Sequence, residues 1–173
     1  MNIVLIGYRG TGKSVISKML ADIIHCQRYC LDDEIAKKAG KSISEIVKQQ
    51  GWENFREIER EVVERVSSEA RSSIIDCGGG VILDDRNVTD LKRNGKVALL
   101  TSSFEKIIHR VSRDLIRPPL EAALSFEEEQ RKVLIERDPK YKAAADCIFD
   151  TSHLKPRQIA IKIIEHFKKK DWI

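Results

Sequence analysis

The chain has 173 residues, of which 42% are hydrophobic and 34% charged, and these proportions describe one soluble globular domain with a buried core. The formal net charge is +4, from 31 basic and 27 acidic residues. This excess is small and scattered, and the one basic cluster, at 168–170, ends a predicted helix, so we expect no nucleic-acid partner. No apolar stretch approaches the length of a membrane span, so we expect no membrane partner.

The cysteine pattern favours a reducing compartment. The four cysteines form no Cys-x-x-Cys pair and have no zinc-type spacing to a histidine; they are Cys26, Cys30, Cys77 and Cys147. Met1-Asn2 leads directly into the first predicted strand, without a signal peptide. We therefore expect reduced thiols in a cytoplasmic protein. The four histidines make no cluster, and we assign them no metal or catalytic role.

The first predicted element is a short buried strand over residues 3–6, which runs into Gly7-Tyr8-Arg9-Gly10-Thr11-Gly12-Lys13-Ser14. This segment fits the phosphate-binding loop pattern G-x-x-x-x-G-K-[ST]. Apolar residues recur at helical spacing from Val15 to Ile24, so a helix follows the loop. An ordinary glycine-rich turn is the alternative, but the order of strand, loop and helix favours a nucleoside triphosphate site.

Each part of this loop has a chemical purpose. Glycines let the backbone turn its N–H groups inward, and the helix points the positive end of its dipole at the phosphates. Lys13 adds a mobile charge for the outer phosphates, and the hydroxyl of Ser14 is the expected Mg²⁺ ligand. The loop residues predicted to bind the nucleotide are Gly10, Thr11, Gly12, Lys13, Ser14 and Val15.

Residues 28–31 predict a second strand, ending in Asp32-Asp33-Glu34. Because ligands bind at the carboxyl ends of parallel strands, we expect these acids to face the same crevice as the loop. The capping box Ser42-Ile43-Ser44-Glu45 starts a helix, and a charged helix opens at Trp52 and runs to about Val66.

A third strand is predicted over 73–77, and Gly78-Gly79-Gly80 follows it at once. Three glycines bury nothing and cost backbone entropy, so they suit a place where the backbone approaches a ligand; a plain flexible turn is the alternative. A helix over 84–91, a strand over 96–100 and a helix capped by the segment 102–105 come next.

The segment 113–120 holds arginines and two consecutive prolines between predicted helices. It is a candidate lid over the phosphates, or else a solvated linker. The helix that starts at Ser125 is expected to run to about Arg137, where Pro139 interrupts it. A fifth strand over 147–149 and a helix starting at Pro156 complete an alternation that predicts an α/β fold, a parallel sheet with helices on both faces.

These motifs, in this order, resemble those of the shikimate kinases. They are the phosphate loop, the acidic residue after strand two, Phe55-Arg56-x-x-Glu59, Gly78-Gly79-Gly80, the Arg117-Pro118 lid and Arg137-x-Pro139-x-Tyr141. The resemblance runs from Ile3 to about Ile164. It implies a three-layer P-loop kinase fold with a five-stranded parallel sheet, in one domain over 1–173. Within that domain it implies a substrate-binding region at about 32–66 and a mobile lid at about 112–125.

The resemblance also implies a reaction and roles. The family transfers the γ-phosphate of ATP to the 3-hydroxyl of shikimate, with Mg²⁺, on the route to chorismate and the aromatic amino acids, and a monomer is the default state. Asp32 is implied to meet the substrate hydroxyls and accept the proton, with Lys13 and Arg117 neutralising charge. Arg56 and Arg137 are implied to grip the carboxylate, since two arginines from distant segments can converge on one anion. The remaining implied contacts are Gly78, Gly79 and Gly80 for shikimate, Arg110 for adenine, and the stretch after Asp150-Thr151 closing over adenine.

One position departs from the family pattern. The family has Asp-x-Asp at the end of strand two, and here Cys30 stands at the first position and Asp32 at the second. A neutral thiol suits a hydrated Mg²⁺ poorly. Our hypothesis is that Asp76, at the end of the next strand in sequence, takes over this outer-sphere role. A one-residue slip that makes Asp33 the partner of Asp32 is one alternative; metal binding by Lys13, Ser14 and phosphates alone is another.

Three rival functions remain open at this stage. A related kinase acting on another hydroxy-acid or sugar acid is disfavoured by Arg56, Arg137 and the triple glycine. A nucleotide-dependent switch is disfavoured because no Asn-Lys-x-Asp segment for guanine recognition is present. A kinase-like protein that has lost activity through the change at Cys30 is the third.

Overall fold

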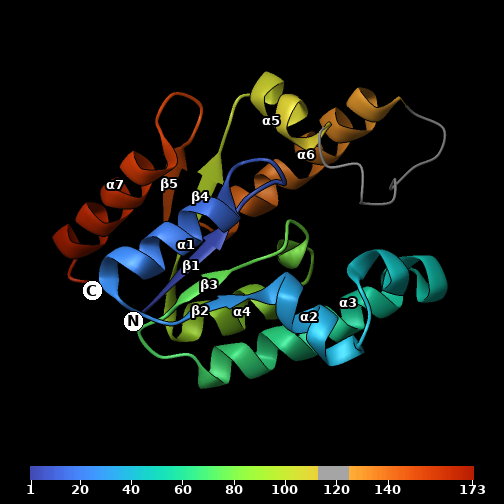
Figure 1. Ribbon diagram of the computed structural model, residues 1–173, viewed down its shortest axis with the longest axis horizontal. Coiled ribbons are helices and arrows are strands. Elements are labelled where there is room, and N and C mark those ends of the chain that lie inside the picture. Colours follow the sequence, from blue (N-terminus) through green and yellow to red (C-terminus); the bar gives the residue numbers. More distant parts are fainter. Residues whose placement is uncertain (113–124) are drawn as a thin grey trace.

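The computed structural model describes residues 1–112 and 125–173 of the chain (Figure 1). Its described strands form one five-stranded sheet in the order β2-β3-β1-β4-β5, and every neighbouring pair is parallel. The predicted α/β fold with a five-stranded parallel sheet is therefore confirmed. The strands are β1 (Asn2–Ile6), β2 (Arg28–Cys30), β3 (Ile74–Asp76), β4 (Gly95–Thr101) and β5 (Cys147–Asp150).

Helices cover both faces of this sheet (Figure 1). Side chains along a strand alternate between the two faces, and the central strand β1 feeds both cores. Ile3 and Leu5 pack with the helices α1 and α7, whereas Val4 and Ile6 join the core built with α3, α4 and α6. The helices are α1 (Lys13–Ile24), α2 (Leu31–Ala39), α3 (Ile43–Glu69), α4 (Asp85–Arg93), α5 (Phe104–Val111), α6 (Phe126–Ala144) and α7 (Pro156–Lys169), with a 3₁₀ turn η1 (Val81–Leu83).

Strand β2 is shorter than the sequence predicted. It ends at Cys30, and the segment 32–34 lies in the first turn of α2 instead of ending a strand. Three carboxylates at a helix N-terminus are stabilised by the helix dipole, which explains why the chain turns helical there. The acids still follow the carboxyl end of β2, so their predicted place beside the phosphate loop is kept.

Of two further helix predictions, one is confirmed and one needs correction. The two helices expected within 42–66 are present: the element α3 is divided by a kink at Gly51, whose backbone is non-helical with φ 79° and ψ 171°. Helix α6 does not stop at Arg137 but continues through Pro139 to Ala144. Tyr141 and Ala144 are buried in the core, and this packing holds the last turns helical despite the proline.

The predicted helix starts are mostly confirmed. The hydroxyls of Ser42 and Ser125 cap their helices in complete capping boxes, and Pro156 stands in the first turn of α7. Helix α5 begins where predicted, but the hydroxyl of Ser103 does not bond to its backbone. In the described part of the chain, no helix combines the length and apolarity needed to cross a membrane.

Candidate active site

The phosphate loop connects β1 to α1, and its own hydrogen bonds hold its shape. Gly10 and Gly12 have φ of 80° and 91°, a left-handed backbone that side-chain-bearing residues rarely adopt. The hydroxyl of Thr11 donates to the carbonyl of Tyr8 at 2.7 Å, and Thr151 donates to the carbonyl of Thr11 at 2.9 Å. A hydrogen bond within the loop and one from Thr151 therefore stabilise the turn.

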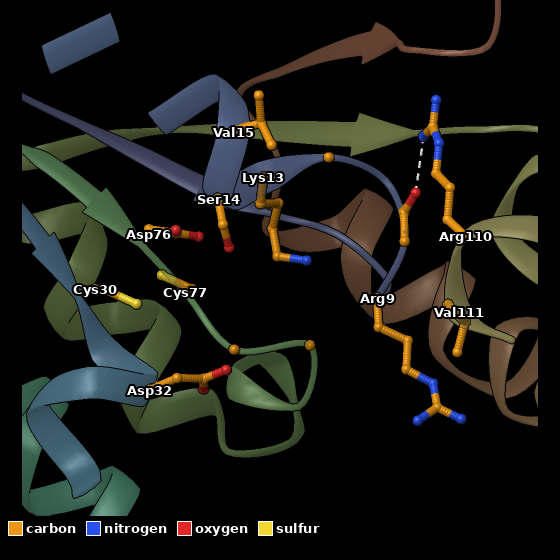
Figure 2. Close-up of a pocket in the computed structure, with 14 residues that line it drawn as sticks. Arg9, Lys13, Ser14, Val15, Cys30, Asp32, Asp76, Cys77, Arg110 and Val111 are labelled. Atoms are coloured by element: carbon orange, nitrogen blue, oxygen red, sulfur yellow. Dashed lines mark hydrogen bonds between the residues drawn. The ribbon is translucent and has the colours of Figure 1, made fainter. Parts of the chain in front are cut away.

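Lys13 is the first residue of α1 and is 8% exposed. Its ammonium donates to the carbonyls of Gly7 at 2.8 Å and Tyr8 at 3.0 Å, both in the loop itself. The lysine thus ties the two ends of the loop together. The same charge faces the pocket that the loop encloses (Figure 2).

This first pocket, the loop pocket, has a volume of about 290 Å³. Arg110 reaches it from α5 and donates from Nη1 to the carbonyl of Gly10 at 2.8 Å. Of the predicted nucleotide residues, only Thr11 among the described ones does not line it, because its side chain turns back into the loop. The predicted residues that do are Gly10, Gly12, Lys13, Ser14, Val15 and Arg110.

A second pocket, the helix pocket, adjoins the first and measures about 60 Å³. The structure brings to it residues from five separate segments of the chain. All the predicted acceptor residues line it, namely Asp32, Arg56, Gly78, Gly79, Gly80 and Arg137, together with apolar side chains of Tyr8, Ile43, Trp52 and Phe55.

Arg56 is fixed from three sides. Its Nη1 lies 2.6 Å from the carboxylate of Glu59, and its guanidinium stacks 4.9 Å from the ring of Phe55. A Cβ on Gly80 would lie 2.1 Å from Nη2, so the absence of a side chain there is what lets the guanidinium lie over the turn. Glu59 is only 1% exposed, and burial raises its pKa, although the charge of Arg56 opposes that rise.

Arg137 and Tyr141 meet the triple glycine from the other side. Arg137 Nη1 donates to the carbonyl of Gly79 at 3.2 Å, and the hydroxyl of Tyr141 donates to the same oxygen. Residues four apart share one face of a helix, so this pair exists because α6 remains helical through Pro139. The turn after β3 is thereby pinned from α6.

Asp32 stands on the border of the two pockets. It lies in the first turn of α2 and lines both of them. A Cβ on Gly78 would lie 2.8 Å from its Oδ1, so glycine again makes the room. Asp33, by contrast, is exposed and lines neither pocket.

Asp76 lies beneath the loop pocket, where Figure 2 shows its carboxylate and the hydroxyl of Ser14 pointing toward the same space. It is 3% exposed, and its Oδ2 accepts from Arg28 at 2.6 Å and Ser17 at 2.9 Å. Cys30 is its direct neighbour across the β2–β3 ladder. Burial raises the pKa of the Cys30 thiol to about 11, so the thiol is neutral at pH 7.

The hydroxyl of Ser14 and the carboxylate of Asp76 fit a magnesium ion, which needs few protein ligands. Within residues 1–112 and 125–173, no group of three or more His, Cys, Asp or Glu residues is placed to hold a metal. A hydroxyl from Ser14 and one carboxylate from Asp76 leave most positions to phosphate oxygens and water, which is how proteins usually hold Mg²⁺.

The sequence analysis assigned no role to several side chains that the structure brings to the site. Arg9 lines both pockets, and Tyr8 and Glu59 line the helix pocket. Arg9 stands inside the loop motif at a position that the pattern leaves open, so no motif could have marked it. The predicted lid residue Arg117 lies outside the described residues.

The fold and the two pockets define a P-loop kinase that phosphorylates a small anionic molecule. The family model for shikimate kinase matches residues 9–168. The shikimate kinase of Syntrophus aciditrophicus is 36% identical over 96% of this chain and 91% of its own length. That of Thermodesulfovibrio yellowstonii is 37% identical over 97% and 95%. The solved shikimate kinase from Acinetobacter baumannii, in complex with shikimate, has a TM-score of 0.90 at 31% identity, covering 98% of this chain and 93% of that one.

The chain belongs to the shikimate kinase family, and its activity is the ATP-dependent phosphorylation of shikimate in aromatic amino acid biosynthesis. The resemblance that the motifs predicted is therefore confirmed. The roles of single residues rest on the geometry above.

Proposed function

We propose that this chain carries out the family's reaction with Asp32 at the point of transfer. The observation that supports this most directly is the position of Asp32, which lines the loop pocket and the helix pocket together. The phosphoryl group must pass from one pocket to the other. A carboxylate on their border is placed to orient the acceptor hydroxyl and to accept its proton.

Shikimate carries a carboxylate, and the helix pocket offers two arginines to hold it. Arg56 and Arg137 come from α3 and α6, and Glu59 and Gly79 orient them. Guanidinium groups bind carboxylates through paired N–H donors, which fixes the ring as well as holding it. The bound shikimate of the Acinetobacter baumannii relative supports an acceptor site of this kind.

The transfer breaks the bond between the γ-phosphorus and the oxygen that bridges it to the β-phosphate. The bond that forms joins the same phosphorus to the 3-hydroxyl oxygen of shikimate, and ADP leaves with the bridging oxygen's electron pair. The hydroxyl proton passes to Asp32. Lys13 balances charge on the phosphates throughout, because its ammonium faces the loop pocket. We assign Arg117 the lid contact, although it lies outside the described residues.

We assign the magnesium site to Ser14 and Asp76. When bound there, Mg²⁺ would neutralise phosphate charge. Asp76 is the register partner of Cys30 on the neighbouring strand. It therefore supplies a carboxylate next to the position where the family has an aspartate and this chain has Cys30. Arg28 and Ser17 bond only to Oδ2, so the bonds recorded for the described residues leave Oδ1 available to a metal-bound water.

We further propose that the chain acts as a cytoplasmic monomer with one domain over 1–173, whose acceptor region spans about 32–66. Four free thiols support a reducing compartment. Residues 113–124 of the lid proposed at about 112–125 lie outside the described residues.

ADP release in a coupled assay tests the function. Shikimate should support turnover, and gluconate and AMP should release no more ADP than the blank. Release with gluconate or AMP but not with shikimate would favour a related small-molecule kinase. No release with any acceptor would instead identify a kinase-like protein without activity.

A further inference from the structure

Arg9 has no part in the roles assigned above, yet it occupies a central position. It lies in the phosphate loop, is partly buried and lines both pockets. Among the described residues, Asp32 and Arg9 are the two charged side chains that do so. The first is an anion suited to the acceptor hydroxyl, and the second is a cation on the same border.

A buried amide holds this arginine by one edge. Arg9 Nε donates to Oε1 of Gln130 at 2.7 Å, and the hydroxyl of Tyr8 donates to the same oxygen at 2.7 Å. Gln130 is fully buried in α6, and its Nε2 donates to Glu129 at 3.0 Å. The side chain of Arg9 is therefore oriented through Nε, which keeps its two Nη groups for another partner.

Other arginines of this chain behave differently. Arg28, Arg60 and Arg65 each direct an Nη group at a carboxylate, on Asp76, Asp90 and Glu34 respectively. The guanidinium of Arg9 instead bonds through Nε to an amide oxygen, and its central carbon lies 5.8 Å from the ring centre of Phe126. Carboxylates thus occupy an Nη group of Arg28, Arg60 and Arg65, whereas Arg9 is held through Nε.

The direction of the side chain points to the acceptor side. In Figure 2 Arg9 leaves the loop away from Arg110, which stays bonded to the carbonyl of Gly10. Arg9 also contributes to the helix pocket, which Arg110 does not. The two arginines next to the loop thus serve different sides of it.

We propose that Arg9 is a further catalytic residue, whose Nη groups bind the phosphoryl group while it moves between ADP and shikimate. Charge in that transition state spreads over the three equatorial oxygens, and a preorganised cation lowers its energy most. The bonds that break and form are those of the reaction above, and Arg9 stays protonated throughout. Gln130 is a positioning residue that acts through Arg9.

The proposal rests on the shikimate kinase reaction, so wild-type ADP release is measured first. Arg9→Met should lower kcat roughly a hundredfold, with KM for ATP and for shikimate changed less than about threefold. Arg9→Lys should recover only part of kcat, because a point charge does not reproduce the fork. Arg86→Met is the control, since Arg86 is 73% exposed and lines neither pocket, and it should keep wild-type kcat.

Ligand binding separates a role in transfer from a role in folding. Calorimetry of Arg9→Met should show unchanged affinity for ADP. Affinity for ADP with aluminium fluoride and shikimate, a mimic of the group in transit, should fall by about the same factor as kcat.

Gln130→Leu should lower kcat about tenfold in the wild type and have no effect in the Arg9→Met background. A kcat within twofold of wild type for Arg9→Met would overturn the proposal. A rise in KM for shikimate at constant kcat would overturn it too, because Arg9 would then be a binding group for the acceptor.

Discussion

The loop pocket and the helix pocket are built in opposite ways. The phosphate loop is one continuous run of eight residues, from Gly7 to Ser14, and the side chains of Thr11 and Lys13 donate to carbonyls of that same run. The helix pocket draws on five segments, namely the phosphate loop, α2, α3, the turn after β3 and α6, and bonds from Arg137 and Tyr141 to Gly79 connect two of them. A site for a group common to many proteins is local, whereas a site for one particular acceptor is assembled by the fold.

Glycine serves a different purpose in each pocket. In the phosphate loop, Gly10 and Gly12 supply a left-handed backbone. After β3, Gly78 and Gly80 have ordinary backbone angles and instead make room for Asp32 and Arg56. Variants on the two sides should therefore separate the binding of ATP from the binding of shikimate, and residues on the border should affect both.

The largest effect is expected for Asp32→Asn, on the border of the pockets. Loss of the proton acceptor should lower kcat by about 10²–10⁴-fold, with KM for ATP almost unchanged. Steady-state ADP release measures both parameters. A variant with wild-type kcat would show that the hydroxyl proton goes elsewhere and that the border position carries no chemistry.

The next largest effect is expected for Arg56→Ala, which should weaken the binding of shikimate without weakening the binding of ATP. Removing half of the carboxylate clamp should raise KM for shikimate roughly thirtyfold and KM for ATP less than twofold. Arg65→Ala, on the same helix but lining neither pocket, is the matched control and should keep both constants. Equal changes in the two KM values would refute the assignment of Arg56 to shikimate.

Asp76→Asn tests the nucleotide side. If this carboxylate orders metal-bound water, the Mg²⁺ concentration for half-maximal turnover should rise about tenfold, and calorimetry should show weaker binding of ADP with Mg²⁺. Adding Cys30→Asp to this variant should restore much of the loss, because the two positions face each other across the strands. Unchanged Mg²⁺ dependence in Asp76→Asn would leave the metal to Ser14 and the phosphates.

The smallest effect is a pH dependence on the acceptor side. Burial raises the pKa of Glu59 above its ordinary value of about 4.5, while Arg56 and Arg137 oppose the rise and Asp32 adds to it. The folded state therefore binds the proton more tightly than the unfolded state does. This contribution to stability is full below pH 4.5 and is lost as the pH rises through the raised pKa.

Urea unfolding measures this effect against Glu59→Gln, which has no proton to lose. The free energy of unfolding of the wild type minus that of the variant should fall as the pH rises above about 4.5, by at most about 1.4 kcal/mol per pH unit. A constant difference from pH 4 to 8 would mean that Glu59 has the same pKa in both states.

Sequence patterns predicted the sheet and the candidate site to a large extent. Each strand of the described sheet was anticipated, most clearly β1, β3 and β4, because their short apolar runs are typical of buried parallel strands. The errors lie at element ends and at Pro139. Proline propensity predicts that the helix ends there, but buried side chains stabilise it as far as Ala144. The short strand β2 and the early start of α2 belong to the same kind of error.

The sequence by itself determined the phosphate loop, the order of strands and helices, and which arginines and carboxylates were candidates. The loop and the elements depend on neighbours in the chain, so spacing reveals them, whereas the candidate arginines and carboxylates came from the resemblance of the motif order to a family. Only the tertiary structure decided that Arg9 reaches both pockets, that Asp76 faces Cys30, and that α6 pins Gly79. Strand register and helix packing set these contacts between distant segments, and both depend on residues that are far apart in the sequence.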